Sequence, residues 1–85
     1  MIRVFTKEKK GKYEIIAVAG HQKDLNNLRL MSYRLRGADK VNLNKDEFGG
    51  PYLQFNCDNF MDANGHYDIK ALQNRVTEWQ KQYGE

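Results

Sequence analysis

The sequence predicts an α+β fold in which an antiparallel sheet is covered on one face by two helices, in the order ββαββα. Two observations support this fold. Segments rich in β-branched and aromatic residues alternate along the chain with segments in which apolar residues recur at helical spacing. Each helical segment has one apolar side, as a helix that covers a sheet requires. The 85 residues form a single domain, 1–85, and a chain of this size buries only about 60–65% of the surface that its unfolded form exposes. A second copy of the chain could therefore complete the core, so we consider a homodimer.

The first two strands are expected at residues 2–6 and 13–19. The segment between them, residues 7–12, has no apolar member. This pattern predicts a hairpin with a longer loop, in which Gly11 supplies the backbone position with positive φ.

The first helix is expected over residues 24–36, with Asp24 as its N-cap and Gly37 at its end. Its apolar side would consist of Leu25, Leu28, Met31 and Leu35. Arg29, Tyr33 and Arg36 share another side, with Arg34 beside them. This is the one segment that carries an apolar and a strongly basic side together, and the basic side should face solvent.

The second half repeats the order of elements with different loops. Strands are expected at residues 40–44 and 52–57, joined by a turn-rich segment, and Leu53, Phe55 and Cys57 should share one face. Asp68 should cap the last helix, which Gly84 ends. The apolar stripe of this helix would be Ile69, Leu72, Val76, Trp79 and Tyr83. We expect Trp79 and Tyr83 in the core, with an interface as the alternative.

Charge is distributed unevenly along the chain. Residues 1–45 contain eleven basic and four acidic side chains, a net charge of +7, and residues 46–85 contain three and seven, a net charge of −4. A basic half attracts polyanions through Coulomb attraction and counterion release. A solvated surface with unevenly scattered charge is the alternative.

Basic residues with aromatic neighbours predict a nucleic-acid-binding surface. The candidate residues are Lys7, Lys9, Lys10, Lys12, Arg29, Tyr33, Arg34, Arg36 and Lys40. RNA is favoured over B-DNA, because the sequence has no helix-turn-helix, zinc-finger or basic-zipper signature and bases can stack on aromatic rings. Of the neighbouring rings, Phe5 and Tyr13 are expected to pack on the sheet rather than to bind bases.

No segment predicts an enzyme, and we expect no catalytic residues and no cofactor. His21 and His66 could act as an acid–base pair in RNA cleavage, but both are expected in loops, where histidines are usually solvated. Cys57 and His66 lack partners at zinc spacing, and residues 62–68 resemble only part of a calcium loop. A capping and turn role for Asn64 and Asp68 is preferred.

The location of the protein is expected to be cytoplasmic, with no membrane partner. The single cysteine, Cys57, excludes an internal disulfide and fits a reducing compartment. The first residues lack the apolar region of a signal peptide, and no apolar run approaches the ~20 residues that span a bilayer.

A second functional hypothesis uses the acidic half. A protein-only interaction module or inhibitor could present its carboxylates as a mimic of nucleic acid to the basic cleft of a nuclease. The residues of this surface would be Asp46, Glu47, Asp58 and Asp62.

In its short length, single domain and basic character the chain resembles, as a general type, the small early accessory proteins of tailed phages. Among these it is similar to the TifA-type RNA-binding inhibitors of ToxN endoribonuclease toxins. The resemblance implies that the two basic segments, residues 7–12 and 29–40, contact RNA. It also implies that an endoribonuclease toxin is a partner, and that the protein blocks a defence in the host cytoplasm.

Overall fold

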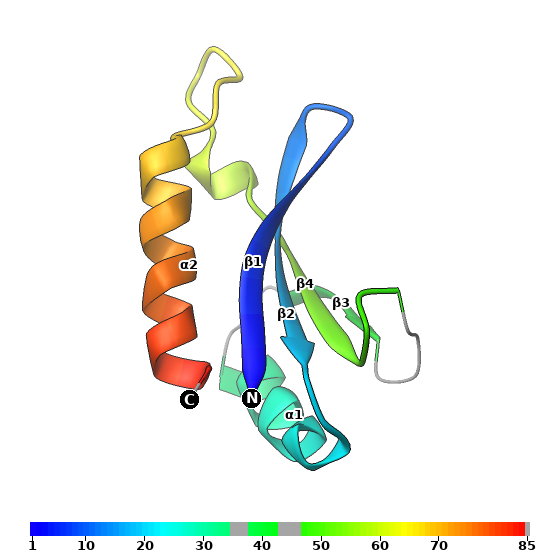
Figure 1. Cartoon of the computed structure of the whole chain (residues 1–85). Coiled ribbons are helices and arrows are strands. Elements are labelled where there is room, and N and C mark those ends of the chain that lie inside the picture. Colours follow the sequence, from blue (N-terminus) through cyan, green and yellow to red (C-terminus); the bar gives the residue numbers. More distant parts are fainter. Residues whose placement is uncertain (35–37, 43–46, 85) are drawn as a thin grey trace.

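The computed structural model describes residues 1–34, 38–42 and 47–84. Its elements are β1 (Ile2–Lys9), β2 (Lys12–Ala19), α1 (Leu25–Arg34), β3 (Ala38–Asn42), β4 (Tyr52–Asn56) and α2 (Ile69–Tyr83), with short 3-10 segments η1 (Gln22–Asp24) and η2 (Asp58–Phe60) (Figure 1). The predicted α+β class and the order ββαββα are confirmed.

The four strands form one antiparallel sheet in the order β1-β2-β4-β3. β2 pairs with β1 on one side and with β4 on the other, so that Ile16 lies between Phe5 and Gln54. β3 pairs with β4 at the far edge, with an irregularity between Ala38 and Lys40. The hairpins therefore meet through β2 and β4, which form the centre of the sheet.

The β1–β2 hairpin is longer and tighter than the sequence predicts. β1 continues to Lys9 and β2 begins at Lys12, so Lys10 and Gly11 alone form the turn, with φ of +54° and +75°. Two consecutive positive φ angles are typical of the tight turn that suits twisted strands. The longer loop predicted over residues 7–12 was wrong, because strand pairing continues through charged residues beyond the last apolar pair.

Both helices lie on one face of the sheet, as predicted. Buried residues of β1, β2 and β4 meet buried residues of α1 and α2 in one core. This core contains Ile2, Val4, Ile15, Ala17, Ala19, Leu28, Met31, Leu53, Phe55, Cys57, Leu72 and Trp79. The expected common face of Leu53, Phe55 and Cys57 is confirmed, and so is the burial of Trp79.

The other face of the sheet carries a smaller apolar cluster that no helix covers. Ile16, Val18 and Tyr52 are buried there, and Phe5 and Phe48 pack against them. Phe48 comes from the segment that precedes β4, so this segment, rather than a helix, shields the centre of the face. Tyr52 is buried because the Phe48 ring packs against its own ring.

The helix ends agree in part with the sequence analysis. Asp68 caps α2, because its Oδ1 accepts a hydrogen bond from the backbone N–H of Ala71 at 3.1 Å, and the helix ends before Gly84. α1 begins directly after Asp24. Leu35, Arg36 and Gly37, the predicted end of this helix, lie outside the described residues, as does Asn44 of the predicted third strand.

Asp24 is buried and its carboxylate accepts a hydrogen bond from the terminal ammonium of Met1. This hydrogen bond, reinforced by the positive charge, holds the pKa of Asp24 below its usual range, although burial opposes the shift. A carboxylate whose pKa is lower in the folded state stabilises the fold above its unfolded pKa of about 3.9, and the contribution is lost as the pH falls through the folded pKa.

We therefore expect the free energy of unfolding to fall as the pH is lowered below about 4. The decline should be shallower in an Asp24→Asn variant, which has no carboxylate to titrate at this position. Urea unfolding of both proteins between pH 2 and 5 measures the difference. Parallel curves for the two proteins would show that this ion pair does not contribute.

Gln80 of α2 takes the place of a neighbouring strand at the exposed edge of β1. Its Oε1 accepts a hydrogen bond from the backbone N–H of Val4 at 2.7 Å, and its Nε2 donates to the carbonyl oxygen of Ile2 at 3.1 Å. Unpaired edge groups are sites for aggregation and cost free energy when buried. The side chain thus joins the last helix to the first strand.

A Gln80→Leu variant should lose about 1–3 kcal/mol of stability, because the substitution leaves both backbone groups without their partner. Chemical unfolding measures the loss. Gln73→Leu is the matched control, since Gln73 is exposed on the same helix and should change stability by less than about 0.5 kcal/mol. Equal effects of the two substitutions would contradict this role of Gln80.

Candidate nucleic-acid interface

The sheet face without helices collects basic side chains from the β1–β2 hairpin. Successive side chains of a strand point to opposite faces, and Ile2 and Val4 are buried against the helices. The alternate residues of β1, together with those opposite them on β2, therefore share the other face. We define the basic sheet face as Arg3, Phe5, Lys7, Lys9, Lys12 and Phe48.

Two aromatic rings form the middle of the basic sheet face. The Phe48 ring meets the Phe5 ring edge-to-face at 5.8 Å between centroids and the Tyr52 ring at 4.7 Å. Tyr52 is fully buried, whereas Phe5 and Phe48 are half-buried. The two phenylalanine rings are thus anchored from below and retain accessible surface, which suits stacking of unpaired bases.

Two cations are held close to these rings. The Arg3 guanidinium lies 5.2 Å from the centroid of the Phe5 ring and donates a hydrogen bond from Nη2 to the carbonyl oxygen of Phe48 at 3.2 Å. The Lys7 ammonium lies 4.7 Å from the centroid of the Phe48 ring. Cation–π attraction and this hydrogen bond orient both charges beside the rings.

Glu47 partly neutralises the positive charge of the basic sheet face beside Lys7. Its carboxylate lies 3.9 Å from the Lys7 ammonium and accepts a hydrogen bond from the Tyr52 hydroxyl at 2.9 Å. Both partners of the ion pair are partly exposed, so the pair contributes little to stability. A phosphate could therefore compete with Glu47 for Lys7 at small cost.

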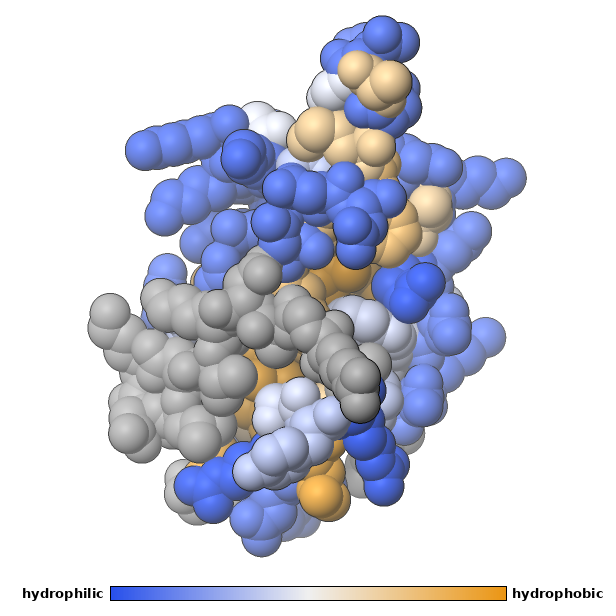
Figure 2. All heavy atoms as spheres, turned by 180° about the vertical axis from the view of Figure 1, so that it is seen from behind, coloured by the Kyte–Doolittle hydropathy of each residue, from blue (hydrophilic) through white to orange (hydrophobic). Residues whose placement is uncertain are grey.

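The outer end of the hairpin concentrates positive charge further. Lys9 and Lys12 are directly opposite each other across the strands, Lys10 lies in the turn between them, and all three are exposed. Like charges in opposite positions destabilise a strand pair, and a bound polyanion would relieve this repulsion. Seen from behind, long hydrophilic side chains project from the body where the hairpin ends (Figure 2).

The second predicted basic group lies elsewhere. Arg29, Tyr33 and Arg34 are exposed on α1, with 82% of Tyr33 accessible. Figure 1 shows α1 at the end of the molecule opposite the hairpin turn. The structure therefore does not bring the lysines of segment 7–12 and the α1 residues into one patch. Arg36 lies outside the described residues. Lys40 is paired with Gln54 in β3, and its side chain also lies outside them.

Sequence analysis missed Arg3 and Phe48. Every second position from 3 to 9 holds a basic or aromatic residue, namely Arg3, Phe5, Lys7 and Lys9. Because a loop was expected from residue 7, these residues were not assigned to one face of a strand. Phe48 carries no local signal, because its place over β1 and β2 depends on the path of the chain into β4. Phe5 packs on the sheet, as expected, and is also the centre of the basic sheet face.

Tyr13, in contrast, lies on the helix side of the sheet. Its ring packs edge-to-face against Tyr67 at 5.0 Å, and it joins the core that the helices cover. The neighbouring Glu8 carboxylate raises the pKa of the Tyr13 hydroxyl, chiefly by charge repulsion of the phenolate. The ring contact with Tyr67 and the place of Tyr13 against the core support its expected packing role.

The candidate catalytic and acidic residues form no cluster among the described residues. The segments that carry His21 and His66 lie at opposite ends of the molecule (Figure 1). Within the ranges that the structure describes, no group of three or more His, Cys, Asp and Glu side chains could hold a metal ion. Asp62 Oδ1 accepts hydrogen bonds from the backbone N–H groups of Asn64 and His66, which is a turn role.

The acidic residues of the second hypothesis are likewise separated. Glu47 lies at the edge of the basic sheet face, where it accepts a hydrogen bond from Tyr52. Asp58, the first residue of η2, accepts hydrogen bonds from the side chains of Asn56 and Tyr67. Asp46 lies outside the described residues. The described residues therefore give no support to a single acidic surface.

Comparisons with known proteins give this chain no relative. Among the described residues, no helix has the length and apolar character needed to cross a membrane. No protein-family model, no curated protein and no solved structure matches the chain.

Proposed function

We propose that this protein is a non-enzymatic RNA-binding protein that holds single-stranded RNA on the basic sheet face. The observation that carries the proposal is that Arg3 and Lys7 lie beside the Phe5 and Phe48 rings, on the same sheet face as Lys9 and Lys12 at the outer end of the hairpin. The cations would neutralise phosphates, and the two rings would stack bases.

The arrangement favours single-stranded RNA over duplex nucleic acid. Phe5 and Phe48 are half-buried within a sheet face, so only bases that are unpaired and turned outward can lie against them. Sequence-specific RNA recognition commonly uses such unstacked bases, whereas the bases of a duplex are stacked on each other. A duplex would reach the exposed lysines and leave the rings unused.

The resemblance to phage inhibitors extends the proposal to a protein partner. The partner would be an endoribonuclease toxin bound to its RNA, which the protein would block in the host cytoplasm. α1 lies at the end of the molecule opposite the hairpin turn, and its residues Arg29, Leu30, Tyr33 and Arg34 are exposed. This helix is available for the toxin or for a second copy of the chain while the basic sheet face holds RNA.

Binding of an end-labelled single-stranded RNA of twelve nucleotides, measured by fluorescence anisotropy, tests the RNA-binding function. We expect binding that weakens with salt, with a slope of log K against log salt of about −3, since each neutralised phosphate of a single strand contributes about −0.7. Duplex DNA of equal charge should bind more weakly, because it cannot use the rings. Absence of binding at low salt, or equal binding of heparin and RNA, would refute base-dependent recognition on this face.

A further inference from the structure

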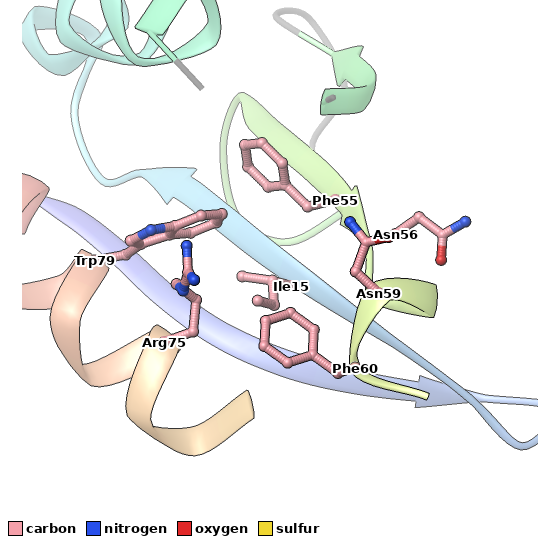
Figure 3. A pocket seen from close by; sticks show the side chains of 7 residues that line it. All are labelled: Ile15, Phe55, Asn56, Asn59, Phe60, Arg75 and Trp79. Atoms are coloured by element: carbon pink, nitrogen blue, oxygen red, sulfur yellow. The ribbon is translucent and has the colours of Figure 1, made fainter. Parts of the chain in front are cut away.

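A cavity of about 330 Å³ lies on the helix side of the sheet, between α2, β4 and η2 (Figure 3). Ile15 and Phe55 contribute apolar surface to it, and the rings of Phe60 and Trp79 line its sides. Arg75, Asn56 and Asn59 provide the polar groups. A cavity with flat apolar walls and a few polar groups of this size is typical of small-ligand sites.

Arg75 lies beside two aromatic rings and has no acidic partner among the described residues. Its guanidinium carbon lies 5.9 Å from the centroids of both the Phe60 and the Trp79 ring. It forms neither an ion pair nor a hydrogen bond with the described residues. The guanidinium therefore retains all its donors for a ligand, and a guanidinium pairs with phosphate or carboxylate through two parallel hydrogen bonds.

The two asparagines differ in their availability. The Asn56 amide is engaged with Asp58, since its Nδ2 donates to Oδ2 and its Oδ1 accepts from the backbone N–H, both at 3.0 Å. The side chain of Asn59 is exposed and forms no hydrogen bond with the described residues. An amide offers a donor and an acceptor together, which matches the edge of a nucleobase.

One row of paired residues on β1, β2 and β4 relates the position of the cavity to that of the basic sheet face. Lys7 is opposite Glu14, and Glu14 is opposite Asn56, so the three side chains lie on the face that carries the basic sheet face. Asn56 also borders the cavity on the helix side. Three adjacent strands place the two ends of this row about 10 Å apart. The outermost described β3–β4 pair is Ala38 with Phe55, and Phe55 and Asn56 line the cavity, which therefore lies at the end of β4.

We propose that this cavity binds one unstacked nucleobase of the RNA strand held on the basic sheet face. Phe60 and Trp79 would contact the planar base, Asn59 its polar edge, and Arg75 the adjoining phosphate. The inference rests on the proposed RNA-binding function and adds to it a base-specific site on the helix side of the sheet, at the end of β4. Such a site would give sequence preference to a surface that otherwise recognises charge and stacking.

Trp79 provides a direct reporter of the cavity, because it is the single tryptophan of the chain, lines the cavity and is 9% exposed. In a titration with the twelve-nucleotide RNA, we expect quenching of tryptophan emission that follows the anisotropy curve. Arg75→Met should remove most of the quenching and weaken RNA binding about tenfold, since charge-assisted hydrogen bonds are among the strong ones. Lys81→Met is the matched control, because it removes one charge from the same helix without lining the cavity.

The outcomes separate the two proposals. RNA binding without a change in tryptophan emission, or equal behaviour of Arg75→Met and Lys81→Met, would overturn the base site and leave the RNA-binding function intact. Absence of RNA binding would refute the proposed function. Titration with AMP and UMP then tests the cavity alone: quenching that Arg75→Met abolishes would support a nucleotide site, and no quenching by either would exclude it.

Discussion

Replacing the hairpin lysines by Lys7→Gln, Lys9→Glu and Lys12→Glu is expected to weaken binding of single-stranded RNA on the order of a thousandfold at low salt. The three side chains belong to the basic sheet face, and Lys9 and Lys12 are exposed and directly opposite each other on β1 and β2. Their substitution removes three phosphate contacts and introduces two repulsive charges. The salt dependence should also become shallower, by about 0.7 in the slope for each lost contact. Anisotropy titrations at several salt concentrations measure both effects.

A matched variant distinguishes the basic sheet face from net charge. Lys23→Gln, Arg29→Glu and Arg34→Glu change the charge by the same amount on exposed residues at the α1 end of the molecule. We expect this variant to bind RNA within about threefold of the unmodified protein, because long-range charge effects between exposed groups are screened. Equal loss in both variants would show that net charge rather than the sheet face determines binding. Glutamine is used at Lys7 because Glu14 and Glu47 are close by.

Replacement of Trp79 by alanine is expected to cost about 3–5 kcal/mol of stability. Trp79 joins α2 to the sheet, and its ring packs edge-to-face against Phe55 at 4.8 Å between centroids. The free energy of unfolding of a small domain is only about 5–15 kcal/mol. A loss of this size should therefore leave the variant partly unfolded at 37 °C. Urea unfolding followed by circular dichroism, which does not require the tryptophan, measures the loss.

Two further substitutions define the cause of this loss. Trp79→Phe should cost clearly less than Trp79→Ala, because a ring remains against Phe55. Glu78→Ala, at the exposed neighbouring position of α2, should change stability by less than about 0.5 kcal/mol. If Trp79→Ala were as mild as Glu78→Ala, Trp79 would be a surface residue available to an interface rather than part of the core.

Local patterning predicted most of the fold. The period of two in β4 and the spacing of Leu28 and Met31 in α1 identify the buried side of each element, because burial of apolar surface dominates folding. Asp68 marked the start of α2 through a hydrogen bond to a residue three positions away. Features of this kind depend on neighbours in the sequence, so the sequence is sufficient to find them.

The hairpin shows where local patterning fails. Residues 7–9 and 12 are polar, and hydrophobic alternation ends before them, yet β1 and β2 stay paired to the turn. Backbone hydrogen bonds and the geometry of Lys10 and Gly11 maintain the strands without an apolar core. The difference affects the proposed site, since a loop would have dispersed Lys7, Lys9 and Lys12, which the strands place on one face.

The fold class and the excess of positive charge in the first half of the chain could be obtained from local sequence patterns, and the same patterns supplied the candidate residues for RNA binding. Which of them lie together depends on the tertiary structure, which places Phe48 beside Phe5 and Lys7 and separates the hairpin lysines from the basic side of α1. It also brought Arg75 beside Phe60 and Trp79. Charge and periodicity are properties of neighbouring residues, whereas a surface or a cavity is formed by residues far apart in the chain, whose proximity depends on strand order and helix packing.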